Sequence, residues 1–164
     1  MAKIEIKEVA KEEIELLSVL ATSILREHYD PIVGVEQNSY MLNKFQSVPA
    51  ITDQFNHGYI YYWGKYEGKN VGFIGFYPVK DRLYLSKFYI LKDYRGKHIG
   101  RKMFEFLIDY ARKKGLKSIY LNVDIHNYES IKVYEHLGFV KTGHEKTDIG
   151  HGYYMDDYVY EYVL

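Results

Sequence analysis

The chain of 164 residues contains no cysteine, which excludes disulfide bonds, thiolate metal sites and a cysteine nucleophile. It also lacks an excess of charge of one sign, because Lys plus Arg and Asp plus Glu both number 22 and the formal net charge is 0. Broad electrostatic capture of nucleic acid or of an anionic membrane is therefore disfavoured. No apolar run approaches the roughly 18 residues of a membrane span, and the segment Met1–Glu5 lacks signal-peptide features. We expect a soluble, cytoplasmic protein.

Prolines number only 3, and no Pro/Gly/Ser-rich linker, internal repeat or low-complexity tract interrupts the chain. Residues 1–164 are therefore expected to form a single domain. Hydrophobic residues make up 47% and charged residues 27%, which is typical of a globular protein. Aromatic residues reach 17%, with 19 tyrosines, so some hydroxyl groups are expected to act as polar groups at a site or an interface.

The first third of the chain reads as a strand followed by helices. Residues 4–9 alternate as an edge strand does, and apolar residues recur at helical spacing from position 11 to position 24. Pro31 disfavours a helical Asp30, so residues 28–34 are expected to form a loop. A second helix carries Tyr40 to Phe45, and a short helical piece follows Pro49 and ends at Gly58.

The remainder alternates between strands and helices. Strands are expected at 59–66 and 71–79, joined by a turn at 67–70, and a further strand at 83–91 follows a turn at 81–82. A strongly amphipathic helix begins near Ile99 and ends before Gly115. A strand at 116–123, a helix at 128–137 capped by Gly138, and strands at 139–147 and 153–164 complete the chain. The order predicts a mixed α/β fold with antiparallel strands first and one strand–helix–strand crossover.

A basic, glycine-containing loop joins the strand at 83–91 to the amphipathic helix. Backbone N–H groups of such a loop and the positive end of the helix dipole together favour an anion such as phosphate. Arg95, Lys97 and Arg101 add positive charge within one turn of that position. The alternative is a plain connection with solvated basic residues. The loop matches neither the Walker sequence nor the GxGxxG fingerprint, so a phosphate site here belongs to another class.

The segment Tyr94–Gly100 (YRGKHIG) resembles the pyrophosphate loop of GNAT-type N-acetyltransferases, whose motif is Arg/Gln-x-x-Gly-x-Gly/Ala. The segment Asn122–Phe139 is similar to the second half of that family, where an Asn follows the fifth strand and a helix ends in Tyr-Glu-x-x-Gly-Phe. The two motifs stand at the usual separation, and the order of elements fits over essentially the whole chain. The resemblance implies a mostly antiparallel central sheet with splayed fourth and fifth strands, flanked by helices.

The resemblance also implies an acetyl-CoA site between the fourth and fifth strands. Backbone groups of Phe88, Tyr89 and Ile90 would pair with the pantetheine arm as an added strand does. Asn127 would hydrogen-bond the pantetheine arm or the substrate, although a helix N-cap explains it equally well. The pyrophosphate would lie on the loop and the first turn of the helix, formed by Arg95, Gly96, Lys97, His98, Ile99, Gly100 and Arg101.

His98 departs from the family motif, which has glycine at this position. Glycine permits a positive φ and lets the backbone approach a phosphate closely. A histidine fits if the loop has already become helical at this point, and its ring would then be able to contact the pyrophosphate.

Tyr134 is the candidate general acid. In the resembled family the matching tyrosine points at the thioester sulfur, where CoA leaves as a thiolate. Full proton transfer from a phenol of pKa about 10 to a thiolate of pKa about 8.5 is uphill by about 2 kcal/mol, but a strong hydrogen bond still stabilises the developing charge. The alternative is that Tyr134 only packs between its helix and the sheet. No single Glu or Asp stands out as a general base.

Other candidates have weaker support. His28, Tyr29 and Asp30 belong to a segment that walls the acceptor site in the family, but they also suit a capping or turn role. The tyrosines of the last strand share one face, which is typical of a core or of a homodimer surface. The seven histidines show no metal-ligand spacing, so no metal is expected, and neither Ser86 nor Ser130 has an evident base.

The leading hypothesis is an acetyl-CoA-dependent N-acetyltransferase that acts on a primary amine of a small molecule by direct attack in a ternary complex. The sequence is loosely similar to the polyamine-acetylating branch, and Asp30, Asp156 and Asp157 suit a cationic amine. The alternatives are a non-catalytic acyl-CoA sensor and an acetyltransferase of protein N-termini. An RNA-binding module is disfavoured by the neutral charge.

Overall fold

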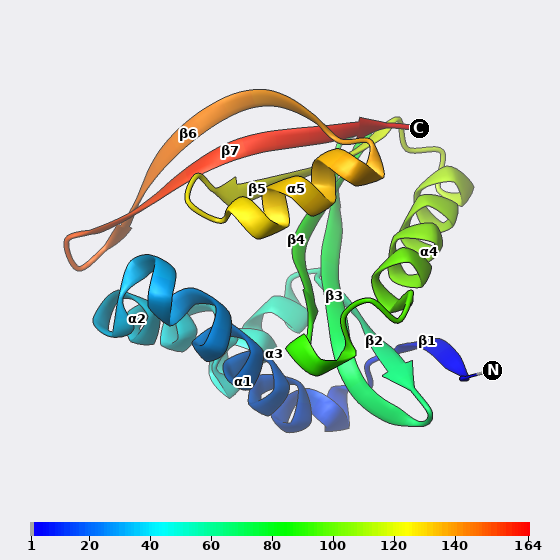
Figure 1. Cartoon of the computed structure of the whole chain (residues 1–164), viewed down its shortest axis with the longest axis horizontal. Helices are drawn as coiled ribbons and strands as arrows, with labels where there is room; N and C mark the ends of the chain where they lie inside the picture. The colour runs from blue at the N-terminus through cyan, green and yellow to red at the C-terminus, as the bar shows by residue number, and fades with distance from the viewer. Residues whose placement is uncertain (1) are drawn as a thin grey trace. The chain divides into compact units, whose positions relative to one another are not determined.

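The computed structural model describes residues 2–164. Met1 is the first residue of the expected domain and of the Met1–Glu5 segment, and it lies outside the described residues. Seven strands form one sheet in the order β1-β2-β3-β4-β5-β7-β6. The strand pairs are mostly antiparallel, helices flank the strands (Figure 1), and the predicted mixed α/β class is confirmed. The chain divides into two compact units, one with the residues up to Tyr77 and Lys87–Leu107, the other with Pro78–Ser86 and Ile108–Leu164. Within residues 2–164 no helix is both long and apolar enough to cross a membrane.

The first unit begins with β1 (Ile4–Glu8), a short 3-10 turn η1 (Lys11–Glu13) and three helices. These are α1 (Ile14–Val33), α2 (Val35–Gln46) and α3 (Val48–Asn56), which contact one another and lie side by side in Figure 1. The chain then forms β2 (Ile60–Tyr66) and β3 (Lys69–Val79). Glu67 and Gly68 connect these strands and both have positive φ (49° and 80°), so the predicted turn is a tight two-residue hairpin.

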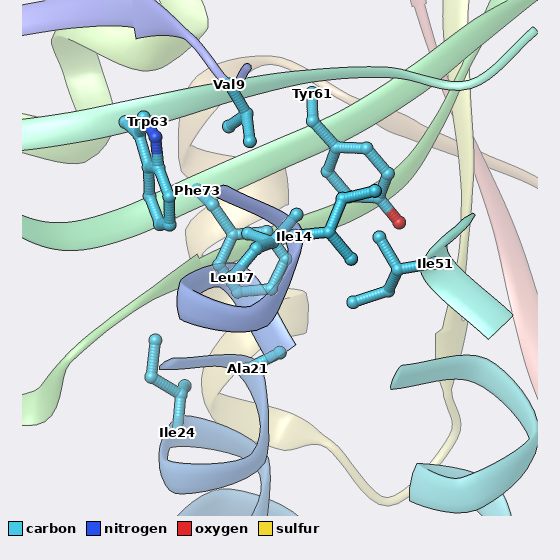
Figure 2. Packing of buried hydrophobic residues seen from close by; sticks show 9 residues of the cluster. All are labelled: Val9, Ile14, Leu17, Ala21, Ile24, Ile51, Tyr61, Trp63 and Phe73. Atoms are coloured by element: carbon cyan, nitrogen blue, oxygen red, sulfur yellow. The ribbon is translucent and has the colours of Figure 1, made fainter. Parts of the chain in front are cut away.

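One face of α1 forms the core of this unit with β2 and β3. Leu17, Ala21 and Ile24 recur at intervals of three and four residues and are at most 3% exposed. Figure 2 shows them facing the rings of Trp63 and Phe73. Burial of each large apolar side chain stabilises the fold by about 1.5–3 kcal/mol, so this periodicity positions the helices on the sheet.

The expected loop at 28–34 is wrong, because α1 continues to Val33 with Pro31 inside the helix. The polar side chains of Asp30 and Asn38 explain this continuation. Arg26 Nη1 lies 3.1 Å from Asp30 Oδ1, and Asn38 Nδ2 donates to the same oxygen at 2.8 Å. Asn38 Nδ2 also donates to the carbonyl oxygen of Leu25 at 3.0 Å. Such hydrogen bonds from the next helix offset the cost of a proline near a helix end.

The strand β4 (Arg82–Ile90), the 3-10 turn η2 (Lys92–Tyr94) and the helix α4 (Ile99–Lys113) follow in sequence. The preceding turn is at Lys80, which has φ of 56°, and Asp81, so Arg82 already belongs to the strand. Gly115, with φ of 71°, ends the helix region as predicted.

The second unit contains β5 (Ser118–Asp124), α5 (Tyr128–Leu137), β6 (Val140–Gly150) and β7 (Tyr153–Val163). Residues 82–84 of β4 pair in parallel with residues 118–120 of β5, and β5 continues beyond this short pairing, consistent with splayed strands. β6 and β7 form a long hairpin (Figure 1). Residues 153–161 of β7 pair with β6, and residues 157–163 of β7 pair with β5. Both predicted strands exist, but β6 extends to Gly150.

The aromatic face of β7 packs against α5 and thus belongs to the core in part. Tyr160 is 2% exposed and its hydroxyl donates to Glu135 Oε2 at 2.9 Å. The ring of Tyr162 lies 5.6 Å from that of Phe139. Tyr154, near the hairpin end, is 50% exposed.

Candidate active site

The basic loop of the first unit, Arg95–His98, is exposed and folds back on the end of β4. Arg95 Nε donates to the carbonyl oxygen of Ile90 at 3.3 Å, and Lys97 Nζ lies 5.6 Å from the centre of the Tyr66 ring. Gly96 has φ of 77°, and a Cβ added there would meet nothing within 4 Å. The loop therefore presents positive charge and open backbone to solvent.

The first turn of α4 continues this surface. Lys102 N donates to His98 O at 3.1 Å, so the N–H groups of Ile99, Gly100 and Arg101 precede the first intrahelical bond and have no acceptor within the helix. A Cβ on Gly100 would lie 3.2 Å from Ile90 Cδ1, so the absence of a side chain lets the helix start close to β4. N–H groups without helical acceptors, the helix dipole and the basic side chains suit a diphosphate.

His98 does not have the helical conformation that the sequence analysis required for it. Its φ is 69°, in the left-handed region, and α4 begins only at Ile99. The histidine thus adopts the backbone conformation that glycine provides in the family motif, at a steric cost of about 1 kcal/mol.

The end of β4 places neighbouring side chains on opposite faces. The Tyr89 ring lies 5.7 Å from the Phe73 ring in the α1-facing core, while Ile90 faces Gly100 of α4. Phe88, Tyr89 and Ile90 are all half-buried.

The weakly supported residues His28, Tyr29 and Asp30 lie in the last turns of α1 rather than in a loop. The Asp30 carboxylate takes part in the polar contacts to Asn38 and Arg26, and the hydrogen bond from Asn38 is the largest cause that lowers its pKa. The rings of His28 and Tyr29 meet edge to face at 4.9 Å. The Asp30 side chain therefore joins α1 to α2, and its role toward the acceptor stays a prediction.

In the second unit, Asn127 and Tyr134 lie at the start and near the end of α5. Asn127 is 2% exposed, and its Oδ1 accepts from Ser130 N at 3.3 Å, which confirms the N-cap role. Tyr134 is half-buried, and its ring meets that of Phe139 edge to face at 5.6 Å. The cap at Asn127 and the left-handed Gly138 fix both ends of the helix that carries the tyrosine.

A row of carboxylates crosses three strands of this unit, and only its member Asp157 was named from the sequence as suited to a cationic amine. Asp157 of β7 lies opposite Asp124 of β5 and opposite Glu145 of β6. Asp157 is 5% exposed. Burial, followed by the neighbouring negative charges, raises its pKa to about 7. Strand register, which the sequence does not reveal, brings these acids together.

Asn122 joins this row to β4. Tyr84 Oη donates to Asn122 Oδ1 at 3.2 Å, and Asn122 Nδ2 donates to Glu145 Oε2 at 3.2 Å. A hydrogen bond from Asn122 partly opposes the rise in the pKa of Asp157. The row can therefore attract a cation or exchange a proton near neutral pH.

Lys87 of β4 was not among the residues that the sequence indicated for a site. It is 5% exposed, and burial lowers its pKa to about 7. Its ammonium has contacts within 3.0 Å to oxygen atoms of Phe45, Gln46, Gln54 and Tyr61. The only hint in the sequence is a lysine in a strand of mostly apolar and aromatic residues. Among residues 2–164 the structure brings no three potential ligands of the His, Cys, Asp and Glu types together for a metal ion.

The chain belongs to the acetyltransferase (GNAT) family, because the sequence profile of that family matches residues 22–139. Among curated relatives, the chain is similar to the probable spermine N(1)-acetyltransferase of Bacillus subtilis subsp. natto (38% identity over 87 residues). It is equally similar to the spermine/spermidine N(1)-acetyltransferase of B. subtilis strain 168 (37% over 87 residues). Each alignment covers 48% of this chain and 57% of the relative, so the chain spans about half the length of these relatives.

The fold matches that of the PaiA N-acetyltransferase of Thermoplasma acidophilum, solved in complex with coenzyme A. The TM-score is 0.82, with 22% identity and 99% of both chains covered. This similarity confirms the fold that the sequence predicted.

Proposed function

We propose that this protein transfers the acetyl group of acetyl-CoA to a primary amine of a small molecule by direct attack in a ternary complex. The observation that carries the proposal is the basic loop and first turn of α4, folded against the end of β4. Arg95, Gly96 and Gly100 provide there what a pyrophosphate needs: charge, open backbone and N–H groups without helical acceptors. Membership of the GNAT family supports the same assignment.

The donor would be held by residues on both motifs. The loop and helix residues 95–101 would bind the pyrophosphate, and backbone groups of Phe88, Tyr89 and Ile90 would pair with the pantetheine arm. Asn127, whose Oδ1 caps α5, would hydrogen-bond the pantetheine arm or the substrate. The donor supplies an activated thioester.

A cationic amine is the proposed acceptor, and polyamines are the class of amine that we favour. The names of two relatives refer to spermine and spermidine. The carboxylate row of Asp124, Asp157 and Glu145 favours positive charge. This supports a substrate with more than one amino group, because one can be bound as a cation while another reacts.

Asp157 and Tyr134 are proposed as the base and the acid. An ammonium of pKa about 10.4 must lose a proton before it attacks, and a carboxylate whose pKa lies near 7 accepts one well at neutral pH. The amine nitrogen then bonds to the thioester carbon, and as the carbon–sulfur bond breaks the nitrogen releases its second proton to solvent, which leaves a neutral amide. The Tyr134 hydroxyl stabilises the leaving thiolate, which takes a proton from it or from solvent.

The proposal includes a cytoplasmic location and no nucleic-acid partner. A homodimer formed through the exposed end of the β7 aromatic face also remains a prediction. These points do not affect the chemistry.

A thiol-release assay with acetyl-CoA and a panel of polyamines, amino acids, aminoglycosides and peptides tests the function. We expect turnover with a polyamine and little with peptides. Preference for peptides with a free N-terminus would favour the protein N-terminus alternative. Calorimetric binding of acetyl-CoA without turnover of any amine would favour the sensor alternative.

A further inference from the structure

Lys87 brings four separate parts of the first unit together through one buried ammonium group. Its Nζ lies 2.9 Å from Phe45 O and 2.9 Å from Gln46 Oε1, both at the end of α2. It lies 3.0 Å from Gln54 Oε1 of α3 and 2.6 Å from Tyr61 Oη of β2. Figure 2 shows the Tyr61 hydroxyl on the side of Ile51, another residue of α3. The lysine itself belongs to β4.

All of these partners are neutral oxygen atoms, so the arrangement depends on the donors of the lysine. An ammonium has three N–H groups, which donate to the oxygen atoms at the end of α2 and to those of Gln54 and Tyr61. The Tyr61 hydroxyl in turn donates to Gln54 Oε1. A buried oxygen that loses its donor destabilises the folded state. The face of the Tyr61 ring, 5.2 Å from Nζ, adds a cation–π contact. Lys87 thus fixes the C-terminal end of α2 to β4.

The N-terminal end of the same helix is fixed to α1. Asn38 of α2 donates to Asp30, and Ser39 Oγ accepts from Arg26 Nη2 at 2.7 Å. The 12-residue α2 therefore connects β4 at one end with the segment His28–Asp30 at the other. A regular helix transmits position well because its hydrogen bonds keep its length fixed.

We propose that Lys87 is a positioning residue for the transfer reaction. Through α2 it holds the segment His28–Asp30, which we include among the contacts of the acceptor, in a fixed position relative to β4, whose residues 88–90 are proposed to pair with the pantetheine arm. This role rests on the proposed function. Small displacements between reactants cost large factors in rate, so a single anchor between the two segments has a measurable effect.

Lys87→Met tests the role because it keeps an unbranched side chain of similar size and removes every donor. Lys44→Met, an exposed lysine of the same helix, is the matched control for the lost charge. With spermidine as acceptor, we expect Lys87→Met to raise the acceptor KM by about tenfold or more and to leave the acetyl-CoA Kd within about threefold. Lys44→Met should leave both constants unchanged. An unchanged acceptor KM in folded Lys87→Met would overturn the role.

Amide hydrogen exchange separates this proposal from the proposed function, since it requires no substrate. In Lys87→Met, exchange should accelerate at both ends of α2 and at residues 28–33, while the amides of 99–102 keep the exchange rates of the parent protein. Acceleration in a protein that acetylates no amine would support the coupling and reject the function. If Lys87→Met fails to fold, Tyr61→Phe removes one of the four oxygens, and unchanged exchange at residues 28–33 would then reject the coupling.

Discussion

At the scale of single residues, the proposed role of the Tyr134 hydroxyl as the general acid leads to the most specific chemical prediction. Tyr134→Phe keeps the ring that packs on Phe139 and removes only the hydroxyl, so the fold should survive. We expect kcat to fall by roughly 10²-fold, with a much smaller change in the KM for acetyl-CoA. Steady-state kinetics with both substrates varied checks this. Turnover within about threefold of the parent would mean that water protonates the thiolate.

His98 has a matched partner in the other unit. His98 and His151 both adopt left-handed backbone conformations, with φ of 69° and 58°. Replacing either by glycine should raise the free energy of unfolding by up to about 1 kcal/mol, because the steric strain disappears. Thermal melts of the two variants measure this effect.

Acetyl-CoA affinity then distinguishes the two histidines. If the His98 ring contacts the pyrophosphate, the affinity of the parent should increase toward acidic pH, because an imidazolium attracts a pyrophosphate more strongly than a neutral imidazole does. This trend should disappear in His98→Gly and persist in His151→Gly. The same trend in both variants would remove the imidazole from the site.

Two buried groups depend on pH in opposite ways. Lys87 has a pKa of about 7 in the fold against an ordinary 10.5, so between these values only the unfolded chain carries the proton. Its contribution to stability therefore increases as the pH rises through that window. Asp157 has a pKa of about 7 against an ordinary 3.8, so the folded chain keeps a proton that the unfolded chain has lost. Its contribution decreases as the pH rises from about 4 to 7.

Asp157→Asn should therefore stabilise the protein while reducing its activity. The amide resembles the protonated acid, so we expect a gain of about 1–2 kcal/mol at pH 8 and almost none below pH 4. Turnover should fall because the base is lost. Thermal melts at both pH values, with exposed Asp109→Asn as control, measure the effect. A gain of equal size at both pH values would contradict the raised pKa.

At the scale of elements, the start of α4 depends on its contact with β4. Valine at position 100 would force a Cβ to within 3.2 Å of Ile90 Cδ1 and add two methyl groups. We expect Gly100→Val to weaken acetyl-CoA binding by about tenfold or more in calorimetry, with an unchanged far-UV spectrum.

Gly143→Val is the matched control for that variant. A Cβ on Gly143 would meet Val159 at an ordinary 3.7 Å, and it lies on β6, which has no assigned contact with the donor. Binding should stay normal in the control. Normal binding in Gly100→Val as well would show that the pyrophosphate assignment is wrong.

The ends of elements differ in how far the sequence determines them. The limits of α5 were predictable because Asn127 and Gly138 act locally, through a side-chain cap and a left-handed residue. The end of α1 was not, because the contacts that retain Pro31 in the helix come from Asn38 of the following helix. Local signals predict a boundary only where no tertiary contact opposes them.

At the scale of the whole molecule, the order of strands and helices and two motifs predicted the fold and the family. The chemistry of Lys87 and Asp157 was not predictable in the same way. Lys87 is perturbed by burial among residues distant in sequence, such as Phe45, and Asp157 is perturbed by burial and by the charge of Asp124. Strand register and helix packing create these environments, and a local sequence pattern predicts neither of them.

The central claim is that an acetyl group passes directly from acetyl-CoA to an amine. Mass spectrometry after incubation with isotopically labelled acetyl-CoA and spermidine tests it most directly. We predict labelled N-acetylspermidine as the product and no label on the protein when spermidine is omitted. Labelled acetate alone, or label that remains on the protein, would contradict direct transfer.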